Sequence, residues 1–195
     1  MRLILASQSP SRASILRGAG VEPVLEPADI DERSLEASLA GHPPADIVAA
    51  LATAKAEKVA ERYPTEPVIG GDSMLLLDGE LQGKPHTEEA TIKRWHQQAG
   101  RTVELLTGHC LIFGDKRHVE TSTTTVHFAQ ASEADIAAYA HSGEPLHCAG
   151  AFTLEAMGGW FIDRIEGDPS SVIGLSLPVV RRALYAFDLN VSDFW

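Results

Sequence analysis

The chain is organised around residues Val68 to Pro85, which read Val-Ile-Gly-Gly-Asp-Ser-Met-Leu-Leu-Leu-Asp-Gly-Glu-Leu-Gln-Gly-Lys-Pro. Asp78-Gly79 between apolar segments predicts a tight hairpin turn, because Gly tolerates positive φ. The hairpin would return Asp72 and Lys84 to the same end of the unit. A carboxylate in an apolar strand is costly to bury unless a positive group meets it. On these residues alone a structural ion pair is favoured, and only the rest of the chain can overturn that interpretation.

The composition is that of a globular protein with a sizeable core. The chain has 195 residues, of which 44% are hydrophobic and 22% charged. No apolar run approaches the ~20 residues of a membrane span, and the N-terminus predicts a strand and not a signal peptide. Cys110 and Cys148 form no disulfide framework, so we expect a cytoplasmic protein. The net charge of -11 argues against a nucleic-acid polymer as ligand, whereas a small phosphate ligand needs only a few local cations.

The N-terminal segment carries the pattern of an anion site. Leu3 to Ala6 predicts a buried strand that runs into Ser7, and Ser9-Pro10 predicts the N-cap and first residue of a helix. Free N–H groups and the helix dipole would point at the turn between them. Arg12 is unfavourable for a first helical turn, which suggests another task, although an ordinary surface arginine remains an equal alternative.

The remaining chain alternates strands and helices at both ends and pairs long strands in its middle. This pattern predicts an α/β fold with a mixed, twisted sheet flanked by helices, and with ligands at strand ends. Lys55 lies beside the apolar stripe of a long helix and either snorkels or reaches a buried anion. The tryptophans at 95, 160 and 195 are expected to pack, and His147 and Cys148 to point to opposite faces of a strand. The expected segments are a strand at 21–25, an acidic loop at 29–32, a polar connection at 35–43, helices at 46–62, 87–98 and from 132, strands at 102–113, 118–128 and 160–165, and a helix after Pro178.

Several motifs follow one another in order along nearly the whole chain: Leu3 to Arg12, Asp31-Glu32, Lys55-Ala56, Gly71-Asp72, Gly83 to Pro85, Thr107-Gly108, Gly143 to Gly150 and Ile165 to Leu175. Together they resemble the Maf family of nucleoside triphosphate pyrophosphatases, once described as septum-formation inhibitors.

This resemblance implies a single domain over residues 1–195, with two lobes and a central cleft, related to the inosine triphosphate pyrophosphatases. It implies hydrolysis of a nucleoside triphosphate to its monophosphate and diphosphate with Mg²⁺ or another divalent cation such as Mn²⁺. The partner is a small nucleotide, with no nucleic-acid polymer and no membrane, and a homodimer is common. Carried over by position, Asp72, Lys55 and Lys84 correspond to catalytic residues, Glu32 and Asp72 to metal ligands, and Ser7, Ser9 and Arg12 to phosphate-binding residues.

Three further positions concern recognition of the nucleotide base of the substrate. One branch of the family, associated with 7-methylguanosine triphosphate, carries an aromatic residue, Gln and Glu where this chain has Ser11, Ser73 and Glu155. Only Glu155 matches. A second branch, selective for thymidine and uridine triphosphates, carries Arg, Thr and Gln at the same three positions, and this chain has none of them. The first branch is therefore favoured, although Ser11 leaves out the stacking partner. The family's Gly-Leu-Pro-Leu reads Gly174-Leu-Ser-Leu177 here. A non-catalytic nucleotide-binding regulator of cell division, and a phosphatase that releases orthophosphate, remain the alternatives.

Overall fold

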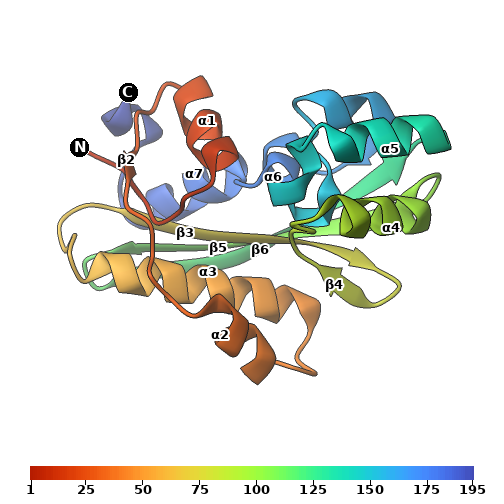
Figure 1. The fold of residues 1–195 in the computed structure, drawn as a ribbon. Helices are drawn as coiled ribbons and strands as arrows, with labels where there is room; N and C mark the ends of the chain where they lie inside the picture. The colour runs from red at the N-terminus through yellow and green to blue at the C-terminus, as the bar shows by residue number, and fades with distance from the viewer. The chain divides into compact units, whose positions relative to one another are not determined.

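The computed structural model describes residues 1–195 and is built on a seven-stranded sheet (Figure 1). The strand order is β2-β1-β3-β5-β6-β7, and β4 pairs with β3. β1 is parallel to β2 and β3, whereas β3–β4 and β6–β7 are antiparallel, so the sheet is mixed as predicted. The strands are β1 (Ile4–Leu5), β2 (Val24–Leu25), β3 (Val68–Leu77), β4 (Glu80–Gln82), β5 (Thr102–Phe113), β6 (Lys116–Phe128) and β7 (Ile162–Glu166).

Seven α-helices and four short 3₁₀-helices complete the fold. Side-chain caps begin several of them where the sequence predicts, since the hydroxyls of Ser9, Thr87 and Ser132 accept N–H bonds from the first helical turn. The helices are α1 (Pro10–Gly18), α2 (Glu32–Ser38), α3 (Pro44–Ala60), α4 (Glu88–Gln98), α5 (Glu133–His141), α6 (Pro169–Ile173), α7 (Leu177–Ala186), η1 (Glu144–His147), η2 (Ala149–Ala151), η3 (Met157–Phe161) and η4 (Val191–Phe194). None of them is long and apolar enough to cross a membrane.

The chain divides into two compact units. The first comprises Met1–Asp72, Thr107–Ser122 and Gly174–Trp195, and the second comprises Ser73–Leu106 and Thr123–Ile173. Strands β3, β5 and β6 contribute residues to both units. The central cleft and the single domain stay predictions.

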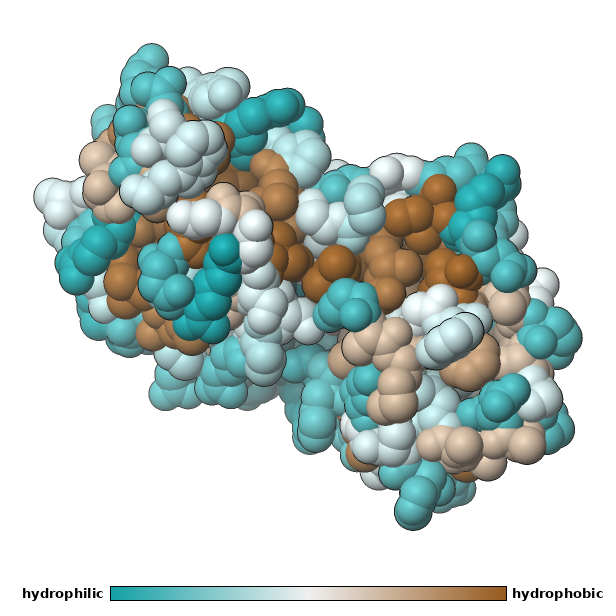
Figure 2. Space-filling model, turned by 90° about the horizontal axis from the view of Figure 1, so that it is seen from above, coloured by the Kyte–Doolittle hydropathy of each residue, from teal (hydrophilic) through white to brown (hydrophobic).

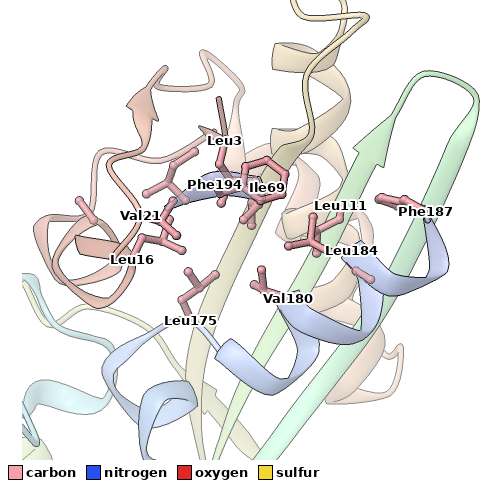
Figure 3. Close-up of a cluster of buried hydrophobic side chains, with 13 residues drawn as sticks. Leu3, Leu16, Val21, Ile69, Leu111, Leu175, Val180, Leu184, Phe187 and Phe194 are labelled. Atoms are coloured by element: carbon pink, nitrogen blue, oxygen red, sulfur yellow. The ribbon is translucent and has the colours of Figure 1, made fainter. Parts of the chain in front are cut away.

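The first unit has helices on both faces of its part of the sheet, with α3 on one face and α1 and α7 on the other (Figure 1). Leu16 of α1, Leu184 of α7 and Ile69 of β3 belong to one buried apolar cluster beneath α1 and α7 (Figure 3). Apolar surface gathers among polar residues on the α1 and α7 side (Figure 2). A cavity of about 270 Å³ there is lined mainly by apolar side chains of α1, α7 and η4, so this core is partly open.

The second unit is packed around Trp95 of α4, which is fully buried. Its ring meets Phe128, Tyr139 and Phe161 edge-on or steeply tilted, with centroids 5.4 to 5.6 Å away. Its indole N–H donates to the Ala151 carbonyl oxygen at 2.8 Å. The expectation that tryptophans pack is correct for Trp95, but Trp160 and Trp195 are 86% and 76% exposed.

The β3–β4 hairpin forms as predicted. Leu77 pairs with Glu80, and the turn residues Asp78 and Gly79 take φ of 53° and 82°. Two consecutive positive φ angles are the signature of a type I′ turn, which matches the twist of a hairpin. β3 itself continues through Gly70-Gly71 without interruption.

Other boundaries were predicted wrongly. Residues 32–38 form helix α2 and not a loop followed by a connection, because Asp31 caps it by accepting the Ser34 N–H at 3.1 Å. Helix α6, for which no prediction was made, begins after Asp168, whose carboxylate accepts the Ser170 N–H at 2.9 Å. Trp160 lies in η3 and not in a strand, and His147 ends η1, so the alternation expected for a strand does not apply to it or to Cys148.

Candidate functional site

Gly70 of β3 lets the sheet approach α3 at backbone distance. A Cβ atom on Gly70 would lie 2.1 Å from the Ala52 carbonyl oxygen and 2.7 Å from the Ala56 nitrogen, which no side chain permits. The strand therefore lies directly against the helix turn that carries Lys55. This contact sets the position of Asp72, two residues further along β3.

Lys55 joins two carboxylates in the first unit. Its Nζ lies 2.7 Å from Oδ1 of Asp72 and 2.8 Å from Oε2 of Glu32, the first residue of α2. The Lys55 and Asp72 side chains are only 10% and 11% exposed, whereas that of Glu32 is 52% exposed. The other oxygen of Asp72, Oδ2, is buried and has no hydrogen-bond partner. Because a buried carboxylate oxygen without a donor is costly, this atom is an open acceptor for a proton, a cation or water.

The Ser7 to Arg12 turn holds a guanidinium in a fixed orientation. Ser7 Oγ accepts from the Ser9 N–H at 3.1 Å and from Arg12 Nη1 at 3.2 Å. Arg12 Nε donates to the Gly174 carbonyl oxygen at 2.7 Å. A Cβ on Gly71 would lie 3.2 Å from Arg12 Nε, so the guanidinium packs on the backbone next to Asp72. Arg12 is thus drawn away from solvent and does not act as a surface arginine.

Burial and charge act oppositely on this guanidinium. Burial lowers the pKa of Arg12, while the carboxylates of Asp72 and Glu32 raise it in part. Arginine remains protonated in proteins because of its high intrinsic pKa. The first unit therefore presents two partly or fully buried cations, Arg12 and Lys55, beside one carboxylate with a bare oxygen. Ser11 lies beside Arg12 in the first turn of α1 and is partly exposed.

The second unit contains the other predicted residues, Ser73, Lys84 and Glu155. Ser73 is partly buried in β3, and Lys84 is exposed two residues after β4. Glu155 is exposed, and its Oε2 accepts the N–H of Leu154 at 3.1 Å. Burial, followed by the charges of Glu155 and Glu144, raises the pKa of Cys148 to about 11, while Lys84 lowers it. Lys84 and Glu155 thus both act electrostatically on one thiol.

Glu144, which the sequence analysis did not single out, organises the segment that carries Glu155. Its Oε1 accepts from the Tyr139 hydroxyl at 3.1 Å, from the Gly158 N–H at 3.1 Å and from the Thr153 hydroxyl. Its Oε2 accepts from the Met157 N–H at 3.2 Å. Burial alone raises the pKa of Glu144, but these hydrogen bonds outweigh it and hold the pKa below its ordinary value. One carboxylate thereby ties together both ends of a loop without regular strand or α-helix.

The sequence reasoning also did not identify Gly174 and His109 as residues of the site. The Gly174 carbonyl accepts a hydrogen bond from Arg12, which lies 162 positions earlier in the sequence, and no local sequence pattern predicts such a contact. His109 is fully buried in β5. The only available signal was a histidine inside an apolar strand directly after the Thr107-Gly108 motif.

The residues present suit a divalent cation only in part. No group of three or more His, Cys, Asp or Glu side chains stands close enough to hold a metal ion. Two oxygens remain suitable, the bare Oδ2 of Asp72 and the half-exposed carboxylate of Glu32. Mg²⁺ commonly takes only one or two protein carboxylates and completes its shell with waters and substrate phosphates, so this donor set fits that ion.

Comparison with known proteins gives one consistent result. The family model described as Maf-like protein matches residues 2–187. A Corynebacterium aurimucosum protein named nucleoside triphosphate pyrophosphatase is 75% identical over 195 residues, covering 100% of this chain and 98% of the relative. Proteins of the same name from Corynebacterium diphtheriae and from Mycobacterium sp. (strain JLS) are 71% and 51% identical, each covering 100% of this chain and 98% of the relative.

Proposed function

Because this chain belongs to the Maf family, we propose that it is a nucleoside triphosphate pyrophosphatase, a hydrolase that converts a nucleoside triphosphate to its monophosphate and diphosphate. The name of its relatives supports the reaction. The observation that carries the proposal is the carboxylate of Asp72, with one oxygen paired to Lys55 and the other buried without a partner.

Asp72 acts as the general base. A water molecule that attacks the α-phosphorus must lose a proton, and a positioned carboxylate oxygen can accept it. The bare Oδ2 is available for that proton, while Lys55 holds Oδ1 and fixes the orientation of the group.

Positive side chains neutralise the charge of the substrate. A triphosphate brings about four negative charges to a protein whose net charge is -11, so positive groups must be concentrated locally. Each cation–phosphate contact at ~4 Å is worth on the order of 4 kcal/mol at an effective dielectric of ~20, before desolvation is subtracted. Arg12, Lys55 and Lys84 take this role in the proposal, with Ser7 and Ser9 at the helix N-terminus as neutral donors.

Asp72 and Glu32 are the residues that would hold Mg²⁺ or Mn²⁺. Such an ion supplies charge neutralisation and polarises a phosphoryl oxygen when it is bound. Lys55 lies within 2.8 Å of one oxygen of each carboxylate and so holds the two acidic groups at one place.

Glu155 is the candidate for recognition of the base. A carboxylate can accept two hydrogen bonds from the N–H groups of a guanine edge, and Glu155 is exposed on the segment tied by Glu144. We therefore propose 7-methylguanosine triphosphate as the first modified nucleotide to test. Ser11 and Ser73 are too short to stack on a base, so recognition would depend on hydrogen bonds.

The test is product analysis with Mg²⁺ over a panel of standard and modified nucleoside triphosphates, on the wild type and on Asp72→Asn. Monophosphate and diphosphate from the wild type, with loss in the variant, support the proposal. Release of orthophosphate would assign a phosphatase instead. Nucleotide binding without turnover of any triphosphate by folded protein would overturn it in favour of a binding regulator.

A further inference from the structure

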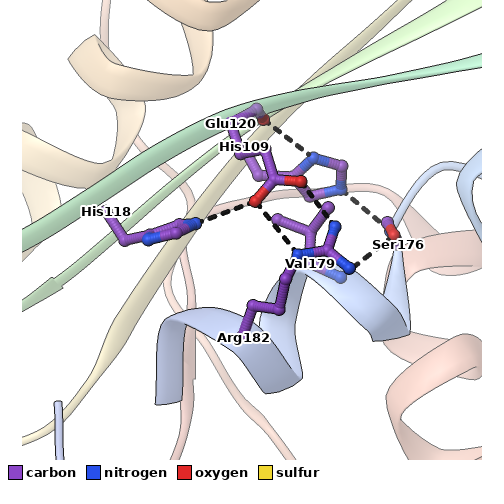
Figure 4. Close-up of polar contacts among 6 residues, drawn as sticks. All are labelled: His109, His118, Glu120, Ser176, Val179 and Arg182. Atoms are coloured by element: carbon purple, nitrogen blue, oxygen red, sulfur yellow. Dashed lines mark hydrogen bonds and ion pairs between the residues drawn. The ribbon is translucent and has the colours of Figure 1, made fainter. Parts of the chain in front are cut away.

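His109 is a buried histidine that the proposed reaction does not use. It is fully buried in β5, with Nε2 2.8 Å from the Ser176 nitrogen and Nδ1 3.3 Å from the Glu120 carbonyl oxygen (Figure 4). Because a backbone N–H can only donate, Nε2 accepts the Ser176 bond and carries no proton. Nδ1 then carries the proton and donates to Glu120. The imidazole is therefore neutral in one tautomer and links β5, β6 and the beginning of α7.

This link ends beside Arg12. Ser176 is the N-cap of α7, and Gly174, whose carbonyl accepts from Arg12 Nε at 2.7 Å, lies only two residues before it. Gly174 takes a φ of 132°, which requires glycine. The position of its carbonyl thus depends on what holds the next residues. His109 holds the Ser176 N–H, and the Ser176 hydroxyl holds the Val179 N–H at 3.2 Å.

Position 176 makes the contact possible. The family pattern that this sequence resembles has proline there, and proline carries no N–H. Serine supplies the donor, and His109 supplies an acceptor at the right place in β5. A buried N–H facing the sheet would otherwise be unsatisfied, at a cost comparable to a lost hydrogen bond. The two residues therefore function as a pair.

We propose that His109 is a positioning residue for this reaction: it fixes the Gly174–Ser176 turn and thereby the guanidinium of Arg12 that receives the triphosphate. The inference rests on the proposed function, because it assigns Arg12 to the phosphates. His109 touches neither substrate nor metal in this role. Small misplacements of a group that orients substrate are expensive in rate, about 10²-fold for 1 Å, so a loosened Arg12 is expected to raise KM for the triphosphate and lower kcat/KM.

Two amide substitutions at position 109 test whether the hydrogen bond to the Ser176 N–H, and not merely a polar side chain, is required. His109→Gln places an acceptor near the former Nε2, whereas His109→Asn is one methylene shorter and cannot reach Ser176. We expect His109→Asn to lower kcat/KM about 10-fold, mainly through KM, and His109→Gln to stay within about 2-fold of wild type. Folding of each is checked by circular dichroism and urea unfolding.

A second pair of variants tests the same hydrogen bond from the side of Ser176. Ser176→Ala removes the hydroxyl but keeps the N–H, whereas Ser176→Pro removes both, and the native φ of -74° already suits proline. We expect Ser176→Pro to reproduce the KM effect of His109→Asn and Ser176→Ala not to. The double variant His109→Asn/Ser176→Pro should be no worse than the more impaired of its two parents, because both remove one contact.

The outcomes are distinguishable from failure of the proposed function. If the wild type turns over no triphosphate, the proposed function fails. If the wild type is active but folded His109→Asn and Ser176→Pro keep its KM and kcat/KM, or if their effects add, the positioning role is overturned. Binding of a non-hydrolysable α,β-methylene triphosphate, measured by calorimetry, gives a readout without turnover. Weaker binding in both variants is expected, and unchanged binding contradicts the proposal. If His109→Asn or Ser176→Pro does not fold, the two variants at the other position test the positioning role.

Discussion

Asp72 in the first unit is buried and Glu144 in the second is partly buried, and their carboxylate oxygens have different hydrogen-bond partners. Both oxygens of Glu144 accept from neutral hydroxyl and N–H donors. Asp72 has one charged partner, Lys55, and one buried oxygen without any donor. A carboxylate with complete hydrogen bonding holds structure, because every acceptor is already used. One that is left incomplete retains capacity for a proton or a cation, and that is the property a reaction needs.

The largest stability effect is expected from removing the cation beside Asp72. Lys55→Met leaves Asp72 buried and unpaired, so the free energy of unfolding should fall by about 3 to 5 kcal/mol, with loss of turnover. Urea unfolding measures the first and product analysis the second. Lys58→Met is the control, because Lys58 is on the same helix but exposed, 3.9 Å from Glu61. If the two variants are equally stable, the Lys55–Asp72 pair is not the stabilising contact described above.

Gly70→Ala tests how the pair is positioned. Its Cβ would meet the Ala52 oxygen at 2.1 Å, so β3 must move away from α3. We expect a loss of about 2 to 3 kcal/mol in unfolding free energy, together with reduced activity, because Asp72 moves with the strand. Gly18→Ala, where nothing lies within 4 Å, is the matched control and should not destabilise the protein. An active, stable Gly70→Ala protein would contradict the close packing.

Glu144→Gln should act on stability and not on chemistry. The amide nitrogen cannot accept, so about 1 to 2 kcal/mol of unfolding free energy should be lost while kcat is retained. The pKa of Glu144 is lower in the folded protein than in the unfolded chain. Ionised Glu144 therefore contributes to the free energy of unfolding at pH values above its pKa in the unfolded chain, and this contribution is lost as the pH falls through its pKa in the folded protein. The stability gap between wild type and Glu144→Gln should therefore narrow as pH falls below about 4.5. A gap that stays constant down to pH 3 would contradict this assignment.

The smallest effect concerns Cys148, which senses the charge of Glu144. With its pKa raised to about 11, its alkylation rate should still rise at pH 10, where an ordinary thiol with a pKa of about 8.5 has levelled off. Glu144→Gln should move the curve to lower pH. Iodoacetamide labelling in a Cys110→Ala background measures this at one thiol. A curve that levels off near pH 9 in both proteins would show that burial and Glu144 do not control the thiol.

Local chemistry explains what could be predicted from the sequence. Ser9-Pro10, Thr87 and Asp78-Gly79 act on neighbouring residues only, so the cap and turn rules placed them correctly. Helix α2 was missed because its cap, Asp31, lies in a run of carboxylates that also suits a solvated loop.

The contacts that were missed join distant parts of the chain. Arg12 contacts Gly174, and His109 contacts Ser176, only once the sheet and α7 have assembled. Lys55 was recognised beside an apolar stripe, but its choice of Asp72 and Glu32 as partners depends on the close approach of β3 to α3 at Gly70. The donors to Glu144 come from irregular segments that no periodicity marks.

The most direct test of the contrast between the two carboxylates measures turnover and unfolding free energy for Asp72→Asn and Glu144→Gln side by side. Asp72→Asn should lose about 10²- to 10⁴-fold in kcat, the range of general-base catalysis, and should lose less stability than Lys55→Met, because Lys55 keeps Glu32 as a partner. Glu144→Gln should show the reverse, a lower unfolding free energy with near wild-type kcat. Asp72→Asn that turns over triphosphate at the wild-type rate, or a stable Glu144→Gln that has lost kcat, would contradict the account.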